Sequence, residues 1–488
     1  MQIDFVAILP EIVLTVTALL VLAADLALRG DAKQLVNPVA GIGTVGAIVA
    51  TVSLWGEERT TFNTMYVVDD FAVVFKLFFL GSLLAILGIS WRYFAEDRFF
   101  QGEYYFLLLT AVIGMLLMPS SRDLLLLFVA LETVSIPAFV MVGLRKRDLY
   151  SSEAALKFFL IGVLSVALML FGISMVYGFT GTTDLVEIAA AIEGDTAAVP
   201  LLLGSVMLVI VGFGFKISVV PFHFWAPDTY AGAPMPVAAM LAVASKAAGF
   251  AGLISVTFIA FQPLADSWAP IMGVIAGLTM TLGNLIALQQ RDIVRLLAYS
   301  SVAQAGYMLV PFGIAEATAG PVNDQAVQSV VFYLAAYALM NIGAFGVAIA
   351  VNRRSGDRAI SDFAGLGARS PLMAMAMTVF LLSLAGIPPT VGFWAKFSVI
   401  QSAVGAATVF GYVLASLIVF NSVIAMFYYL RVAGLMWLSE PKESAVALRP
   451  GLQLSFVVAG LTVLTIILGI VPGLITDNTV ETQVVATQ

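Results

Sequence analysis

The sequence consists largely of apolar runs about 20 residues long, separated from one another by charged residues or by glycine and proline. A helix of about 20 apolar residues crosses a bilayer core about 30 Å thick. These runs predict an all-α polytopic membrane protein with about fourteen transmembrane helices. The predicted spans lie near residues 5–28, 37–55, 68–91, 104–120, 123–144, 153–178, 199–219, 235–260, 269–290, 293–314, 328–351, 372–402, 409–433 and 452–474.

Composition excludes several classes of protein. Hydrophobic residues make up 61% of the 488 residues and charged residues 11%, against roughly 45–50% and about 25% in globular chains. The net charge of −7 leaves no basic surface for nucleic acid, so we expect no nucleic-acid partner. The absence of cysteine excludes disulfides, Cys-held zinc and iron–sulfur clusters, and a single histidine argues against haem. We therefore expect no cofactor and no metal in this chain.

The 23 lysine and arginine residues predict the orientation of the chain. Connections that follow even-numbered spans hold only Arg59 and Arg122, whereas most of the cations follow odd-numbered spans. Cytoplasmic loops collect positive charge, so the odd connections are predicted to be cytoplasmic and both termini to be outside. Asp4 and Glu11 stand where a signal peptide would be positive, which predicts that the first span is retained. The cations after odd-numbered spans are Arg29, Lys33, Arg92, Arg98, Arg145, Lys146, Arg147, Arg291, Arg295, Arg353, Arg354, Arg358, Arg369, Arg431, Lys442 and Arg449.

The five remaining cations lie within predicted spans, and all of them are lysine: Lys76, Lys157, Lys216, Lys246 and Lys396. Arginine stays charged, whereas a desolvated lysine can exchange a proton. The pattern therefore favours titrating groups over fixed charges. The alternative is that some of these side chains extend to an interface and keep their ammonium groups in water, and it stays open above all for Lys76 and Lys157, which are nearer to helix ends.

Glu132 lies in the middle of the fifth span, where a carboxylate is costly unless it is paired or protonated. Either state suits a proton relay, and the alternative is a polar contact that only joins two helices. Glu153 and Lys157 are four residues apart at the start of the sixth span, so they share a helix face and can form a pair. That pair is either functional or structural.

Prolines interrupt two of the predicted spans beside a lysine. Lys216 precedes Pro221, Pro388 and Pro389 precede Lys396, and each break is followed by Phe-Trp. Proline removes a backbone donor, which membranes tolerate where the backbone is buried in protein or faces a watered cavity. Two broken helices five spans apart suggest two five-helix repeats, inverted because five is odd. Two ordinary proline kinks are the alternative.

Other polar groups lie between these two breaks. Lys246 sits among small residues that permit close helix contact. The tenth span supplies side chains that could order water between charged sites. His223, beside the first break, is either an interfacial histidine or a proton carrier. The side chains of the tenth span are Tyr299, Ser300, Ser301, Gln304 and Tyr307.

Four segments resemble the antiporter-like membrane subunits of respiratory complex I. They are LETVSIPAFVMVGLRKRDLYSSEAALKFFLIG, PFHFWAPDTYAGAPMPVAAMLAVASKAAGFA, RDIVRLLAYSSVAQAGYML and AGIPPTVGFWAKF. The resemblance implies fourteen helices and two inverted five-helix half-channels joined by a line of charged residues. With the predicted spans, it divides the chain into an N-terminal three-helix segment at 1–103, repeats at 104–260 and 269–433, and a C-terminal helix and tail at 434–488.

The resemblance also implies roles for single residues. Glu132 and Lys216 would be the coupled pair of the first half, Lys246 the central relay, and Lys396 the carrier of the second half. Glu153, Lys157, His223, Gln304 and Tyr307 are the supporting candidates. Lysine at 396 favours the subunit N branch of the family over the M branch, which usually has glutamate there, and the short stretch after the last span argues against the L branch.

Two positions depart from the family pattern. Gln304 stands where many relatives have histidine, and Ala231 stands where many have glutamate before Gly-Ala-Pro. Glutamine does not titrate, so at position 304 it could only orient water.

The resemblance implies a proton-translocating subunit of NADH-quinone oxidoreductase, a translocase that couples quinone reduction elsewhere to proton transfer in this chain. FMN, iron–sulfur clusters and quinone are expected in partner subunits. The expected partners are the K and M subunits, further antiporter-like subunits, the peripheral redox arm and the lipid bilayer. The expected location is a bacterial-type cytoplasmic (inner) membrane.

Three rival interpretations remain open. The chain could belong to a cation/proton antiporter, or to a related quinone oxidoreductase that takes electrons from ferredoxin or a reduced deazaflavin. It could also be a structural spacer, but a spacer has little reason to bear the cost of five intramembrane lysines.

Overall fold

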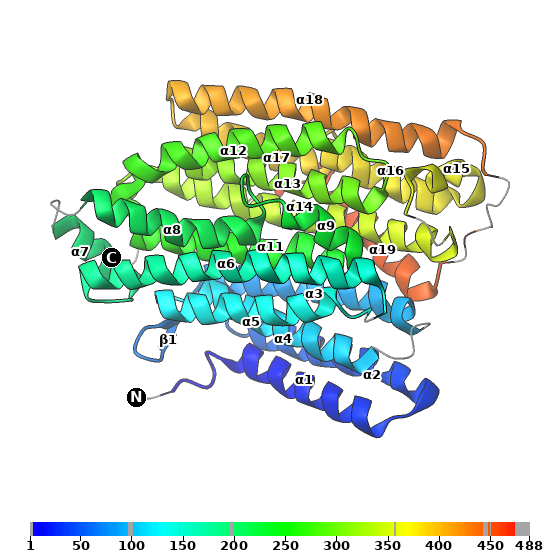
Figure 1. Ribbon diagram of the computed structural model, residues 1–488, viewed down its shortest axis with the longest axis horizontal. Helices are drawn as coiled ribbons and strands as arrows, with labels where there is room; N and C mark the ends of the chain where they lie inside the picture. The colour runs from blue at the N-terminus through cyan, green and yellow to red at the C-terminus, as the bar shows by residue number, and fades with distance from the viewer. Residues whose placement is uncertain are drawn as a thin grey trace.

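The computed structural model of the protein describes residues 3–95, 101–145, 147–194, 199–355, 358–442, 448 and 450–473. Three of the cations used to predict the orientation, Arg98, Lys146 and Arg449, lie outside the described residues, as does most of the predicted C-terminal tail. Most of the described chain is helical, and the long helices run along the longest axis of the molecule (Figure 1).

The first part of the chain contains eleven α-helices and a two-stranded hairpin in its described residues. The helices are α1 (Leu9–Ala27), α2 (Val36–Val52), α3 (Asp70–Ala95), α4 (Gln101–Ser120), α5 (Leu124–Val142), α6 (Leu149–Thr180), α7 (Leu185–Gly194), α8 (Val199–Ile217), α9 (Trp225–Gly232), α10 (Met235–Met240) and α11 (Lys246–Ser255). The strands are β1 (Arg59–Thr61) and β2 (Tyr66–Val68), which pair antiparallel.

The second part contains eight α-helices in the described residues. They are α12 (Ala265–Ala287), α13 (Ile293–Leu309), α14 (Pro321–Ser355), α15 (Leu366–Arg369), α16 (Pro371–Ala385), α17 (Val391–Gly405), α18 (Val409–Leu438) and α19 (Leu452–Ile470). Within the described ranges, thirteen helices are long and apolar enough to cross a membrane. The twelfth predicted span is divided between α16 and α17, so the prediction of about fourteen spans is confirmed.

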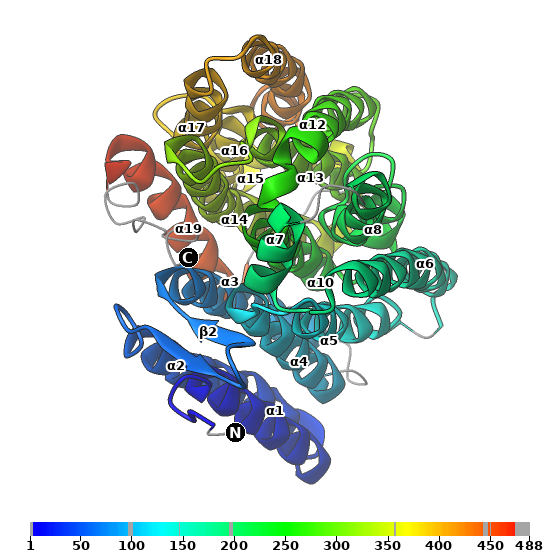
Figure 2. The ribbon, with the colours of Figure 1, turned by 90° about the vertical axis from the view of Figure 1, so that its left-hand side faces the viewer.

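Two short elements were not predicted, the β1–β2 hairpin and helix α7. The hairpin has strands of only three residues, too short for a periodic pattern. Helix α7 has ten residues, too few to span a bilayer, and it lies across one end of the bundle (Figure 2). Its apolar residues Leu185, Ile188 and Ile192 are buried there. Both elements follow even-numbered spans and lie at the same end of the molecule, opposite α15 (Figure 1).

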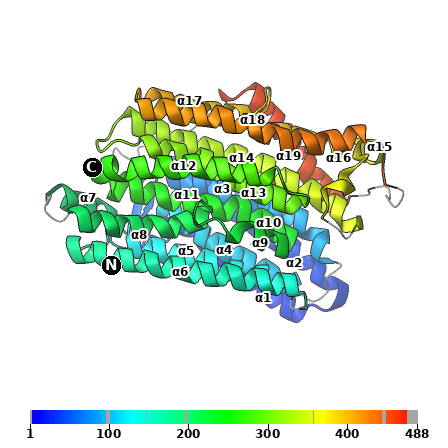
Figure 3. The same cartoon turned by 45° about the horizontal axis from the view of Figure 1, so that its top comes forward.

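The helices pack as two groups with α14 near the centre. Figure 3 shows α6 at one edge of the bundle and α17 and α18 at the other. Helices α1 and α2 pack against each other and against α3 and α4, and they form one side of the molecule (Figure 2). Helix α14 packs against α16, α17 and α19 and is largely buried.

One local structure occurs twice. Asp123 caps the N-terminus of α5, and Asp292 caps α13; each carboxylate accepts hydrogen bonds from two backbone amides at 2.7–3.0 Å. Each aspartate also forms an isolated antiparallel bridge, Asp123 with Asp184 and Asp292 with Ala359. Each bridge is made to the segment that follows the next long helix, α6 or α14. Both aspartates follow an arginine, a repeated Arg-Asp signal that the analysis of the sequence missed.

The first predicted helix break is confirmed between α8 and α9. Helix α8 ends at Ile217 and α9 begins at Trp225. The indole Nε1 of Trp225 donates to the Phe215 carbonyl at 3.0 Å, and the Val220 amide donates to the Thr279 hydroxyl of α12 at 3.0 Å. Groups freed by the break therefore find partners inside the protein, as the bilayer interior requires.

The second predicted break is confirmed between α16 and α17. Helix α16 ends at Ala385, and Gly386 follows with a φ of +84°, a left-handed conformation that favours glycine. The Gly392 amide in the first turn of α17 donates to the Ser383 hydroxyl at 3.0 Å. In both places the helix stops and restarts, so these are interruptions and not kinks within a continuous helix.

The eighth span is not a uniform α-helix. A π-helical segment at Leu241–Ser245 joins α10 to α11, and another at Val256–Ala260 follows α11. Single π-turns within helices often occur at functional sites. Lys246 is the first residue after the first of these segments, and residues 235–258 of this span are all buried.

Candidate functional site

Lys216 lies in the last turn of α8, immediately before the first break, and is buried. Its ammonium group donates to the Ser135 hydroxyl of α5 at 3.0 Å. Its stem packs close to Gly249 of α11, where an added Cβ would come within 3.1 Å of Lys216 Cγ. The small residues around Lys246 therefore let α8 approach α11 and bring the two lysines onto neighbouring helices.

Glu132 is near Lys216 but not in direct contact with it. It lies one helical turn before Ser135 on α5 and is half-buried. Its Oε1 atom is buried without a hydrogen-bond partner. Within the described part of the chain, Lys216 binds the hydroxyl of Ser135 and no carboxylate of Glu132. Ser135, one turn after Glu132, is therefore the observed partner of Lys216, and sequence analysis missed it.

Lys246 is fully buried at the start of α11. Its ammonium group donates to the Ser301 carbonyl at 2.7 Å and to the Ser301 hydroxyl at 3.1 Å. Ser301 belongs to α13, in the second part of the chain. A single serine therefore joins the central lysine to the second group of helices.

Lys396 lies in α17 and reaches back across the second break. Its ammonium group donates to the carbonyl of Ala385, the last residue of α16, at 2.9 Å. It also lies 4.8 Å from the centre of the Tyr307 ring. The interruption of the helix thus supplies a free carbonyl, and that carbonyl is the partner of the lysine.

Helix α13 connects Lys246 to Lys396 along one face. Ser301, Gln304 and Tyr307 are three residues apart, so their side chains follow one another along the helix. Gln304 donates to the Leu384 carbonyl at 3.2 Å, next to the Ala385 carbonyl that binds Lys396. Polar groups of a single helix therefore span the interval between the two lysines.

Gln304 is held in one orientation by its neighbours. Its side-chain oxygen accepts from the Tyr333 hydroxyl of α14, and its amide nitrogen donates to Leu384 and, at 3.4 Å, to Tyr429 of α18. Tyr429 in turn shares a hydrogen bond with Ser300. The glutamine is a fixed donor and acceptor within a buried network of protein groups, and its role in orienting water stays a prediction.

Tyr307 belongs to a second buried network. Asn284 of α12 donates to the Tyr307 hydroxyl at 2.9 Å and accepts from the Tyr428 hydroxyl at 2.9 Å. Asn421 of α18 donates to Thr281 at 3.1 Å. Asn284, Asn421, Tyr333, Tyr428 and Tyr429 were not selected from the sequence, because single polar residues in apolar helices carry no spacing signal.

Buried hydroxyl groups without partners lie between Lys216 and Lys246. Ser218 follows Lys216 by two residues, and its hydroxyl and that of Tyr230 have no hydrogen-bond partner. The Tyr230 hydroxyl lies close to both Ser218 and Ser301. Buried polar groups in native proteins are usually satisfied, often by ordered water. The described residues thus leave two buried hydroxyls unpartnered close to the lysine partner Ser301.

Glu153 and Lys157 form the predicted pair, at 2.8 Å, but on the surface of the protein. Lys157 also binds Asp228 of α9 at 2.9 Å, and Asp228 accepts from Arg295 of α13 at 2.9 Å. Lys157 is 45% exposed and Glu153 60% exposed. Lys157 therefore keeps its ammonium group near water, which agrees with the alternative that this side chain extends to an interface.

These charges line a cavity of about 350 Å³. Asp228 lies between the candidate spans that end at Ile217 and begin at Met235. Burial opposes its ionisation, but hydrogen bonds from Lys157 and Arg295 hold the pKa of its carboxyl below its usual range. Ala231, the second departure from the family pattern, also lines this cavity, and its carbonyl accepts from Arg358.

His223 lies within the first break and is buried. Its Nδ1 atom has no hydrogen-bond partner, and its ring lies 4.4 Å from that of Phe224. It touches none of the lysines through a hydrogen bond in the described residues. Tyr299 is half-buried and, two residues before Ser301, lies on nearly the opposite face of α13.

Lys76 is fully buried and forms an ion pair at 3.0 Å with Glu11 of α1. The alternative that Lys76 extends to an interface is therefore wrong. The partner, Glu11, lies far away in the sequence, near the start of the first span, and its negative charge had served only as a sign that this span is not a signal peptide.

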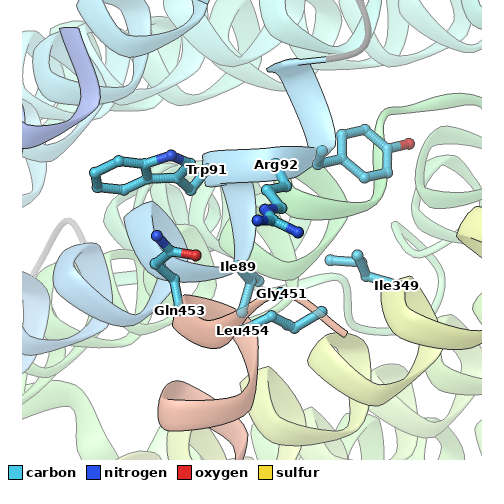
Figure 4. A pocket seen from close by; sticks show the side chains of 9 residues that line it. Ile89, Trp91, Arg92, Ile349, Gly451, Gln453 and Leu454 are labelled. Carbon is cyan, nitrogen blue, oxygen red and sulfur yellow. The ribbon is translucent and has the colours of Figure 1, made fainter. Parts of the chain in front are cut away.

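The described residues contain no group of three or more His, Asp and Glu side chains that could hold a metal ion. A small pocket between α3, α14 and α19 is lined by Trp91, Arg92, Ile349 and Gln453 (Figure 4). Its volume of about 10 Å³ is close to that of one water. It lies apart from the lysines and is too small for an organic cofactor.

Replacing Gly386 by alanine is expected to disturb Lys396. The positive φ strains any residue with a Cβ, and an alanine Cβ would lie 2.8 Å from Lys396 Cδ. We expect a destabilisation of about 1–3 kcal/mol, measured as a lower temperature of thermal release of this chain from its assembly. Gly434→Ala is the control, since an added Cβ there meets only the far end of Leu438 at 4.0 Å. If the Gly386 variant and the wild type were released at the same temperature, position 386 would not require glycine.

Comparison with known proteins identifies the family. The family model described as NADH:quinone oxidoreductase/Mrp antiporter, TM, matches residues 121–425. A protein of Streptomyces griseus named NADH-quinone oxidoreductase subunit N 2 is 43% identical over 92% of this chain and 86% of its own length. A subunit N from Trichlorobacter lovleyi is 40% identical over 89% of this chain and 88% of its own.

Solved structures share the fold. A chain of respiratory complex I from Thermus thermophilus with bound aureothin superposes with a TM-score of 0.80 at 32% identity, over 97% of this chain and 99% of that chain. A chain of the Mrp complex from Dietzia has a TM-score of 0.82 at 22% identity, over 97% and 95%; at that identity the likeness concerns the fold alone. With the matched model and the similar subunits taken together, the chain belongs to the NADH:quinone oxidoreductase/Mrp antiporter family of membrane subunits.

Proposed function

We propose that this chain is the proton-translocating membrane subunit of an NADH-quinone oxidoreductase, of the subunit N type. The named relatives at 37–43% identity and the complex I chain at 32% identity support this proposal. The Mrp likeness is at lower identity, so the cation/proton antiporter is the less favoured alternative. The chain acts as a translocase subunit and works with redox centres that other subunits hold.

The main support for proton transfer is that Lys216, Lys246 and Lys396 are buried without a charged partner. Each buried ammonium group binds neutral oxygen atoms only: Ser135, Ser301 and Ala385. In the described residues no carboxylate is within ion-pair distance of any of the three. A buried charge without a counterion is costly, and lysine, unlike arginine, can relieve that cost by releasing a proton. These three amines therefore suit the uptake and release of protons.

The proposed path of transfer runs along these contacts. A proton that leaves Lys216 passes through water between the Ser218, Tyr230 and Ser301 hydroxyls to Lys246. From there the polar face of α13 leads to Lys396. Gln304 orients this segment by fixed hydrogen bonds, and Tyr307 borders Lys396. Three further residues are supporting candidates for proton transfer beside this path: His223, and, at the charged cavity, Glu153 and Lys157.

Glu132 couples the first lysine to its surroundings. Its buried, unpartnered oxygen can change its charge without breaking a hydrogen bond. At an effective dielectric constant near 20, two unit charges interact by about 4 kcal/mol at 4 Å and still by about 2 kcal/mol at 8 Å. That energy is enough to decide whether a neighbouring lysine holds a proton. Charging of a neighbouring subunit would act on Lys216 through Glu132.

The domain division and the orientation belong to this proposal. The repeated caps at Asp123 and Asp292 and the two broken helices support two inverted five-helix repeats, at 104–260 and 269–433. The segments at 1–103 and 434–488 flank them. The distribution of cations supports a cytoplasmic-membrane location with both termini outside.

The expected partners are the K and M subunits, further antiporter-like subunits and the peripheral redox arm, which would hold FMN, iron–sulfur clusters and the quinone site. Purification of the tagged chain in mild detergent, with mass spectrometry of what co-purifies, tests the proposal. We expect flavin and iron–sulfur subunits, together with NADH-driven proton uptake in vesicles. An assembly of membrane subunits alone, with sodium-dependent proton exchange, would replace the proposal by the antiporter.

A further inference from the structure

A second cluster of titratable groups lies outside the line of the three lysines. It consists of Glu11 in the first turn of α1, Tyr66 in β2, Lys76 in α3 and Ser120 at the end of α4. All four side chains are buried. The cluster lies at the end of the bundle that carries the hairpin. We call these four residues the Glu11–Lys76 cluster.

Three of its members form a closed ring of hydrogen bonds. Lys76 donates to the Tyr66 hydroxyl at 2.7 Å, and that hydroxyl donates to Glu11 Oε1 at 2.7 Å. The ring is completed by the ion pair between Lys76 and Glu11 Oε1 at 3.0 Å. Tyr66 thus links the acid to the base through two short hydrogen bonds, in addition to their direct contact.

The other oxygen of Glu11 has no donor. Glu11 Oε2 is buried without a hydrogen-bond partner, and so is the hydroxyl of Ser120, which lies close to the Tyr66 hydroxyl. A buried carboxylate oxygen without a donor bears a desolvation cost. A protonated carboxyl group carries less of that cost, and a water between Glu11 and Ser120 would satisfy both orphaned atoms.

The cluster stabilises helix packing less than apolar side chains in the same place would. A buried ion pair contributes little or nothing compared with apolar residues of the same size, and ionisable residues inside membranes generally mark functional sites. Two nearby acidic residues have ion-pair partners of their own: Asp69 pairs with Arg122 at 2.5 Å, and Asp4 pairs with Arg59 at 3.0 Å. No other charged group is within hydrogen-bond distance of the cluster in the described residues.

We propose that the Glu11–Lys76 cluster is a proton-exchanging site, separate from the three lysines, that communicates with the aqueous phase at the hairpin end of the bundle. Lys76 gives a proton to the Tyr66 oxygen while Tyr66 gives its own proton to Glu11 Oε1. The pair changes from ammonium and carboxylate to amine and carboxylic acid, with no change in net charge. Glu11, whose side chain is 8% exposed, then exchanges this proton with water.

A hydrophobic carbodiimide tests the inference, because it modifies protonated carboxyl groups within membranes. The intact purified assembly is treated at a series of pH values, and modification of Glu11 is measured by mass spectrometry of its peptide. We expect modification in the wild type that increases as the pH falls. Tyr66→Phe keeps the direct ion pair but removes the hydroxyl that donates to Glu11 Oε1. A carboxylate that loses a hydrogen-bond donor is protonated more readily, so this variant should raise modification of Glu11 severalfold.

Lys76→Met supplies the reference for accessibility. Without its base, Glu11 should remain protonated and be modified severalfold more than in the wild type. Asp25→Asn is the matched control on the same helix, since Asp25 forms a partly exposed ion pair with Lys33 at 2.8 Å; it should leave modification of Glu11 unchanged. Modification of Glu11 in Lys76→Met but not in the wild type at any pH would overturn the proposal and leave a fixed ion pair. Because no electron donor is needed, this result is independent of the function proposed above.

Discussion

Lys246→Met is expected to lower NADH-driven proton uptake by roughly a hundredfold, the usual cost of losing a positioned proton donor and acceptor. Methionine fills a similar volume in the buried site, so the assembly should remain intact. The Ser301 carbonyl and hydroxyl lose their donor, but no opposing charge is left without a partner. Proton uptake and quinone reduction are measured together in vesicles that contain the purified assembly.

Lys246→Arg separates titration from charge. Arginine keeps the positive charge but does not release its proton, so this variant should be as inactive as Lys246→Met. Ser301→Ala removes one of the two acceptors of Lys246 and should have a smaller effect. Lys33→Met is the control, because Lys33 makes a partly exposed ion pair outside the site. An unchanged number of protons per electron in Lys246→Met would refute the role of Lys246.

Lys76→Met is expected to destabilise the protein by about 3–5 kcal/mol, because Glu11 loses its counterion and has to take up a proton to stay buried. The matching change Glu11→Leu removes the second charge. The double variant should therefore recover most of the lost stability, since an apolar pair of similar volume often replaces a buried ion pair without loss. The temperature at which the purified assembly releases this chain gives the comparison.

The contrast with a surface pair makes this prediction specific. Lys33 and Asp25 are 2.8 Å apart but partly exposed, and such pairs contribute only about 0–1 kcal/mol. Lys33→Met should therefore leave the release temperature almost unchanged. If Lys76→Met released the chain at the wild-type temperature, the Glu11–Lys76 ion pair would not stabilise the fold.

The positions of the spans and the two breaks could be read from the sequence because lipid enforces them. A helix must be apolar over the thickness of the bilayer, and proline cannot continue it. The break before Trp225 and the break after Ala385 were therefore predictable. Helix α7 and the β1–β2 hairpin were not, since neither obeys the constraint of crossing the membrane.

For the buried lysines, the sequence predicted their positions but not their partners. The sequence alone indicated that Lys216, Lys246 and Lys396 are intramembrane groups, because a lysine within an apolar run is visible in one dimension. Their partners were decided by packing. Lys216 binds Ser135, although Glu132 was the expected partner, and Lys396 binds a carbonyl that exists only because α16 stops.

The sequence by itself determined a polytopic helical membrane protein, its two interrupted helices and the presence of lysines within its spans, since the cost of burying charge and backbone in lipid leaves few alternatives. Only the tertiary structure decided which groups meet: Lys246 with Ser301 on another helix, and Lys76 with Glu11 and Tyr66. Helix packing sets these contacts through side-chain shape across distant segments, and no spacing along the chain records it.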